Sequence, residues 1–143
     1  FLHSLFEQVW NHRFLYRDLN NLLSGNRHLE THFHAVLERK TRAFRQMLES
    51  LAAAGLMRLD ADSVETLSAS MSVMVTYWLS YEYVRNPRQA MEPANAGLAL
   101  TRGAQHVLAL LTPYMANTDL QTHLQALTAA YSSPRSAETQ EKR

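Results

Sequence analysis

The chain has 143 residues, the length of one ordinary domain, and 46% of them are hydrophobic. Its 4 Gly and 4 Pro are too few for the many turns of an all-β fold, and a formal net charge of +1 gives no electrostatic basis for nucleic-acid binding. Because the chain has no Cys, disulfides, thiolate metal sites and a cysteine nucleophile are excluded.

Residues 1–24 are predicted to be helical with one interruption. Apolar side chains recur at the helical period, but a polar triplet at 11–13 falls where the apolar stripe should continue, so we expect a break near His12. Gly25 is expected to end this segment in the left-handed conformation. Phe1 lies in an apolar stripe with no capping residue before it, which predicts that the chain is part of a longer protein.

The next helix is predicted over residues 27–54, with an apolar stripe along its length. The stripe has a gap at Lys40 and Thr41. We interpret Lys40 as a side chain that lies along the apolar surface and reaches solvent, and a polar group that faces a cavity is the alternative. Gly55 is expected to end the helix in a Schellman motif.

A central helix is predicted over residues 61–84, where Asp62 and Glu65 form a capping-box signal. Residues 71–79 are apolar on most sides, so other helices should surround this one. Its Met, Trp and Tyr side chains suit the wall of a small-molecule cavity, although the spacing alone favours plain core filling.

Two further helices are predicted near the C-terminus. The first, over residues 94–111, has one face of small residues and one of large apolar residues, and Pro113 should kink or end it. The second begins at Thr118 and carries a narrow apolar seam, which is typical of a helix that packs on a single partner. Residues 132–143 are predicted to be a disordered tail, so the folded domain should cover residues 1–131.

The sequence contains no recognisable catalytic or metal site. His28 and His32 lie one helical turn apart, but a zinc site needs three or four converging ligands, and no carboxylate has di-iron spacing. No glycine-rich phosphate loop and no GxSxG motif is present, and Asp18 beside Arg17 is most simply a structural ion pair. We therefore expect no enzyme activity, no catalytic residue, no metal and no cofactor.

Nothing in the sequence indicates a membrane or an export route. No apolar run approaches the roughly 20 residues that a membrane helix needs, and no signal peptide opens the chain. We expect a cytoplasmic protein without a membrane partner.

A resemblance to the C-terminal regulatory domain of TetR-family transcriptional repressors is carried by residues 5–29, LFEQVWNHRFLYRDLNNLLSGNRHL. One branch of that family has a phrase like W–x–x–R–F–L–Y–R–D–L–x–x–L–L before a long helix. The segments AAAGLMR (52–58) and TYWLSYEY (76–83) are similar to the same branch. The resemblance covers about residues 1–131, and with the predicted helices it gives an all-α, antiparallel bundle of about six helices.

The resemblance implies the ligand-sensing and dimerisation domain of a TetR-type regulator. In that family, two late helices of each subunit form the four-helix bundle of a homodimer, and a small effector binds among the central helices and alters DNA binding. The family's helix-turn-helix domain is absent from this chain, so DNA would be contacted only through that missing N-terminal domain. A helical protein–protein interaction module without a ligand pocket is the alternative, and a helical enzyme is a weaker one.

Carried onto this sequence, the resemblance places the dimer interface on the last two helices. The predicted interface residues are Gly97, Thr101, Ala104, Leu108, Leu120, Leu124, Leu127 and Tyr131. A small apolar effector would bind in a pocket lined by Trp10, Tyr16, Asn20, Leu37, Met74, Trp78 and Tyr81. These side chains would give an apolar wall with a few phenol, indole and amide groups that orient the ligand.

Overall fold

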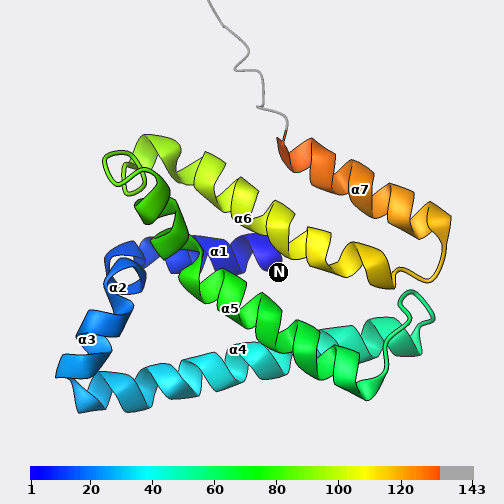
Figure 1. The fold of residues 1–143 in the computed structure, drawn as a ribbon, viewed down its shortest axis with the longest axis horizontal. Helices are drawn as coiled ribbons and strands as arrows, with labels where there is room; N and C mark the ends of the chain where they lie inside the picture. Colours follow the sequence, from blue (N-terminus) through cyan, green and yellow to red (C-terminus); the bar gives the residue numbers. More distant parts are fainter. Residues whose placement is uncertain (133–143) are drawn as a thin grey trace, which may run out of the picture.

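The computed structural model describes residues 1–132, and the regular elements in that range are all helical (Figure 1). They are α1 (Leu2–Asn11), α2 (Arg13–Arg17), α3 (Leu19–Gly25), α4 (Arg27–Ala53), α5 (Ala61–Arg85), the 3-10 helix η1 (Pro93–Asn95), α6 (Ala96–Leu111), the 3-10 helix η2 (Thr112–Tyr114) and α7 (Thr118–Ser132). The predicted all-α fold class is confirmed. The predicted tail lies, from residue 133 onward, outside the described residues.

Helix α5 lies in the middle of the fold as predicted, but the prediction that other helices surround it is wrong on one face, where Val73 and Tyr77 are 57% and 41% exposed. Figure 1 shows it crossing between α4 and α6 and running antiparallel to α4, and it also contacts α1 and α2. Each of these helices buries apolar side chains against it. Fully buried side chains on α4, α5 and α6 are Phe44, Leu48, Val75, Leu79 and Val107.

The N-terminal segment is broken twice. The break at His12, between α1 and α2, confirms the prediction, and a second break at Asp18 separates α2 from α3. Both residues leave the helical conformation, with ψ angles of 28° and 17°, while their N–H groups still bond to the preceding turn. The two bends allow α1 to pack on α6, α2 on α5 and α3 on α4.

Gly55 ends α4 in the predicted Schellman motif. Its φ is 72°, and the N–H of Leu56 donates to the carbonyl of Leu51 at 3.0 Å. Gly25 does not behave as predicted, because it is the last residue of α3 and Gly55 is the glycine with positive φ. The chain instead changes direction at Asn26, which is extended and caps α4.

The start of α5 is capped two residues earlier than the capping-box signal at Asp62 suggests. Asp60 is the N-cap, and its carboxylate accepts a hydrogen bond from the N–H of Ser63 at 2.8 Å. Hydrogen bonding from the Ser63 side chain, together with this backbone bond, lowers the pKa of Asp60. Asp62 lies in the first turn, where a negative charge still favours the helix dipole.

The polar gap in the stripe of α4 faces inward. Lys40 is only 8% exposed, so the prediction that it reaches solvent is wrong. Its Nζ donates to Thr76 Oγ1 of α5 at 3.2 Å, and Thr41 Oγ1 lies 2.8 Å from Ser72 Oγ. The gap is therefore a polar layer inside the contact between α4 and α5.

The loop after η2 is tied to the loop after α4. Pro113 lies in η2, where α6 ends as predicted. The N–H of Arg58 donates to Tyr114 O at 2.8 Å, and the N–H of Ala116 donates to Leu56 O at 3.0 Å. These bonds fix the start of α7, which packs along α6.

Candidate ligand site between α5 and α6

An apolar groove of about 550 Å³ lies between α5 and α6. Val73, Tyr77 and Tyr81 follow one another at steps of four and so share a face of α5, and they are 57%, 41% and 52% exposed. The groove is therefore open to solvent along α5. Its lining residues are Ala69, Ser70, Val73, Met74, Tyr77, Trp78 and Tyr81 of α5 and His106 of α6.

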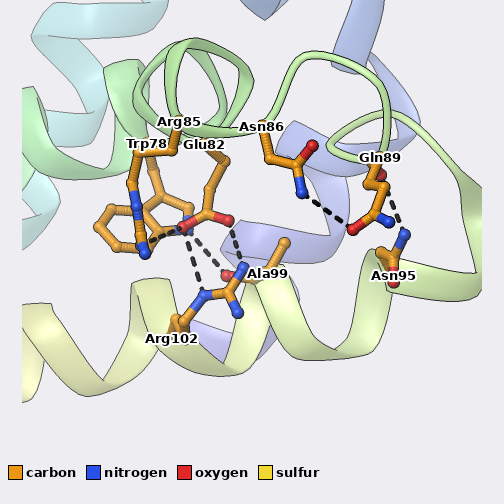
Figure 2. Close-up of polar contacts among 8 residues, drawn as sticks. All are labelled: Trp78, Glu82, Arg85, Asn86, Gln89, Asn95, Ala99 and Arg102. Carbon is orange, nitrogen blue, oxygen red and sulfur yellow. Dashed lines mark hydrogen bonds and ion pairs between the residues drawn. The ribbon is translucent and has the colours of Figure 1, made fainter.

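Trp78 is the most buried side chain of the lining. Its indole N–H donates to the carbonyl of Ala99 on α6 at 2.8 Å (Figure 2). Its ring lies beside those of Tyr81 and His106, with centroid separations of 5.3 and 5.1 Å. Because the polar end of the indole is already bonded, Trp78 offers the groove an aromatic surface and no free donor.

A buried carboxylate joins α5 and α6 next to this site. Glu82 lies one turn after Trp78 and is 5% exposed. Figure 2 shows its carboxylate facing the guanidinium of Arg102, with which it forms an ion pair, and Nη1 of Arg85 lies 3.7 Å away. An unpaired charge in this position would be costly, so the ion pair holds the two walls of the groove together.

Helix α6 approaches α1 and α5 closely at Gly103. A Cβ atom at this position would lie 2.6 Å from Phe6 Cε1 and 2.9 Å from Trp78 Cδ1. Such distances leave no room for any side chain here. The indole of Trp78 therefore contacts the groove on one side and the packing of α6 against α1 on the other.

A second, smaller hollow of about 260 Å³ lies beside α2, α3 and α5, and its lining is mainly polar. Arg17 Nε donates to Asp18 Oδ1 at 2.8 Å, and this hydrogen bond lowers the pKa of Asp18. Tyr77 lines both hollows. The lining residues of the second hollow are Arg17, Asp18, Leu19, Asn20, Asn21, Tyr77 and Ser80.

Comparison with known proteins gives the family. A family model described as "TetR: Bacterial transcriptional repressor" matches residues 1–123. The chain belongs to the TetR family. The solved structure of a TetR-family transcriptional regulator from Marinobacter aquaeolei VT8 shares the fold, with a TM-score of 0.75 and 24% identity. No curated protein sequence matches the chain.

The similarity covers 91% of this chain and 59% of the Marinobacter regulator. This TetR-family chain therefore spans less than two thirds of that regulator's length.

In this TetR-family domain, the residues predicted to line one pocket fall in three places. Met74, Trp78 and Tyr81 line the groove, whereas Asn20 lines the smaller hollow. Trp10 and Tyr16 are buried in the helical core, because the bends at His12 and Asp18 turn α1 and α2 toward it, and Leu37 of α4 is half-buried. The residues that line neither hollow are Trp10, Tyr16 and Leu37.

Sequence reasoning missed five lining residues of the groove, which are Ala69, Ser70, Val73, Tyr77 and His106. The steps of four from Val73 through Tyr77 to Tyr81 were a usable signal, because they place the three on one face of α5. His106 had no such signal. Its place depends on how α6 is rotated against α5, which local sequence does not specify.

The residues predicted for a dimer interface also differ in exposure within the single chain. Gly97 and Leu127 are exposed, with Leu127 at 45%. Ala104 is buried inside its own subunit at 2% exposure, so a partner would not meet its side chain. The half-buried residues are Thr101, Leu108, Leu120 and Leu124. The side chain of Tyr131 lies outside the described part of the chain.

Residues 1–132 contain neither a cluster of metal-ligating side chains nor a helix that could span a membrane. No three His, Asp or Glu side chains there lie together as a metal site would require, and His28 and His32 are both exposed. No helix in that range is long and apolar enough to cross a membrane.

Proposed function

We propose that this chain is the ligand-sensing and dimerisation domain of a TetR-type transcriptional regulator, and that a small apolar effector binds in the groove between α5 and α6. The observation that carries the proposal is the groove itself: a chain of this family leaves Val73, Tyr77 and Tyr81 partly exposed around a hollow of about 550 Å³. Exposed apolar surface of this kind is costly unless a ligand or a partner covers it.

The lining favours an effector that is mainly apolar and flat. Aromatic rings offer their faces to a planar ligand, and Met74 can adapt to its outline. The polar groups available are the hydroxyls of Ser70, Tyr77 and Tyr81 and the imidazole of His106. A few hydrogen bonds at the rim would orient such a ligand, while burial of apolar surface would supply the affinity.

The route from effector to DNA would begin at Trp78. A ligand that displaces the indole would also change the packing at Gly103, where α6 lies against Phe6 of α1. We propose that DNA is contacted by a helix-turn-helix domain outside this chain, which agrees with the 59% of the Marinobacter regulator that the chain spans. A shift of α1 would then reposition that domain.

The groove can be tested with N-phenyl-1-naphthylamine, a neutral dye whose fluorescence rises in apolar surroundings. Val73→Asp places a charge in the lining and should weaken dye binding about tenfold or more. Val84→Asp is the matched control, because Val84 is 81% exposed on the same helix and does not line the groove. It adds the same charge and should leave binding unchanged.

Each result has a clear reading. Equal binding by both variants would place the dye elsewhere and remove the support for the groove. No binding by the unmodified chain, together with a stable dimer, would favour a helical interaction module over a ligand sensor.

A further inference from the structure

His106 differs in kind from the other residues that line the groove between α5 and α6. Its neighbours in the lining are apolar or carry hydroxyl groups. An imidazole is the side chain that changes its charge between about pH 5 and pH 8. The ring of His106 lies beside that of Trp78, with a centroid separation of 5.1 Å and an interplanar angle of 39°. This contact orients the imidazole at the wall of the groove.

The nitrogen atoms of this imidazole have no partner inside the domain. Within residues 1–132, His106 makes no hydrogen bond and no ion pair, and its contact with Trp78 is between rings. The side chain is also exposed. A neutral imidazole has one N–H donor and one acceptor nitrogen, and a protonated one has two donors. A ligand in the groove can therefore bond to His106 without displacing an internal partner.

The charge beside the groove is unbalanced toward positive. Two guanidinium groups share the carboxylate of Glu82, since Arg102 forms an ion pair with it and Nη1 of Arg85 lies 3.7 Å away (Figure 2). Arg102 lies one turn before His106 on α6, and the guanidinium of Arg85 lies 5.6 Å from the ring centroid of Tyr81 in the lining. Two positive charges against one negative charge favour an anionic ligand over a cationic one.

The remaining charged groups around the lining do not cancel this excess. Glu65 precedes the groove on α5, and it forms an ion pair with Arg45 of α4. The other titratable groups of the lining are the phenols of Tyr77 and Tyr81. From α1, α7 and the other elements that pack on α6, no hydrogen bond or ion pair reaches His106 within the described part of the chain.

We propose that the groove takes a planar aromatic carboxylate, whose ring lies against Tyr77 and Tyr81 and whose carboxylate bonds to the imidazole of His106. The inference rests on the proposed function, since it names the class of effector for the same groove. One carboxylate matches one imidazolium, and hydrogen bonds between charged partners are about twice as strong as neutral ones. A volume of about 550 Å³ accommodates two fused rings with one carboxylate.

The test displaces N-phenyl-1-naphthylamine from the full chain with 2-naphthoate or with 2-naphthamide, which is uncharged and nearly the same shape. At pH 6 the naphthoate should bind about fivefold or more tightly than the amide, and this preference should be smaller at pH 8, because imidazole side chains lose their charge toward that pH. In His106→Gln the preference should fall and no longer depend on pH. His32→Gln is the matched control, because His32 is an exposed histidine of α4 outside the lining.

A second readout follows the imidazole itself. The Cε1 proton resonance of His106, assigned by its absence in His106→Gln, should shift more with 2-naphthoate than with 2-naphthamide. Equal affinity for the two compounds at pH 6, or a pH-dependent preference that survives in His106→Gln, would overturn the proposal. If Val73→Asp still weakens dye binding in that case, the groove stands and only the carboxylate is wrong. Dye binding that Val73→Asp leaves unchanged would remove both.

Discussion

Replacing the buried Lys40 should stabilise the fold, whereas most substitutions of buried residues destabilise it. The amine is buried with a neutral partner, and desolvation lowers its pKa from 10.5 to about 8. Below pH 8 the amine is protonated in both states, and the charged form is less stable in the folded chain than in the unfolded one. Burying it therefore lowers the free energy of unfolding. Lys40→Met removes the penalty and keeps the apolar stem, and it should raise the free energy of unfolding by about 1–3 kcal/mol at pH 7.

The stability of the unmodified chain should also depend on pH through Lys40. Between pH 8 and 10.5 the unfolded state binds more protons than the folded state, so the stability of the unmodified chain should rise with pH across that window. The advantage of Lys40→Met should shrink over the same range. Urea unfolding at pH 7 and pH 10 measures both effects. A less stable variant at pH 7 would mean that the Thr76 contact outweighs desolvation.

At the scale of helices, Gly103 sets the distance between α6 and its neighbours. Gly103→Ala puts a methyl group 2.6 Å from the ring of Phe6, which is fully buried and cannot move freely. We expect a loss of about 1–3 kcal/mol in the free energy of unfolding. Gly97→Ala on the same helix meets nothing within 4 Å and should be neutral or stabilising by up to about 1 kcal/mol.

Thermal or chemical unfolding of the two variants tests this contact. Both substitutions replace Gly by Ala on α6, so helix propensity favours both variants and a loss of stability in Gly103→Ala alone reports on the close contact. Equal stability of the two variants would show that Phe6 or Trp78 relaxes without cost. The close approach would then not constrain the position of α1.

Helices could be predicted from sequence because their signals are local. The period of apolar residues gave α4 and α5 nearly to their ends, and the polar triplet gave the break at His12. Capping was less certain, since Asp60 and Asp62 are both suitable and only the backbone shows which one bonds to Ser63. Gly25 shows the same limit, because Asn26 takes the change of direction that glycine usually takes.

The candidate site was less predictable because it depends on contacts between distant segments. Lys40 has its partner 36 residues away, and the same gap in an apolar stripe is equally compatible with a solvent-facing lysine. Trp10 and Tyr16 are residue types that often line pockets. The bends before and after α2 direct their side chains toward the core, where both are buried. Residue type indicated a pocket, whereas helix rotation decided which side chains form it.

Over the whole molecule, the C-terminal pair of helices remains the surface on which we propose a second copy packs. Helices α6 and α7 pack against each other within one chain, and Ala104 of α6 is buried in that chain. Leu98 and Leu127 remain 55% and 45% exposed on the two helices. Two exposed leucines on adjacent helices are what a helical dimer interface would bury.

The chain should therefore be a dimer at micromolar concentration, with twice the mass of one chain by light scattering. Leu127→Lys places a charge in the proposed interface and should yield monomers, because an unpaired buried charge costs several kcal/mol. Leu56→Lys is the matched control, since Leu56 is 40% exposed in the loop between α4 and α5. If both variants stay dimeric, the subunits meet elsewhere, and the exposed face of α5 around Val73 and Tyr77 becomes the surface to test. That result would also bear on the groove, because a partner rather than an effector would then cover it.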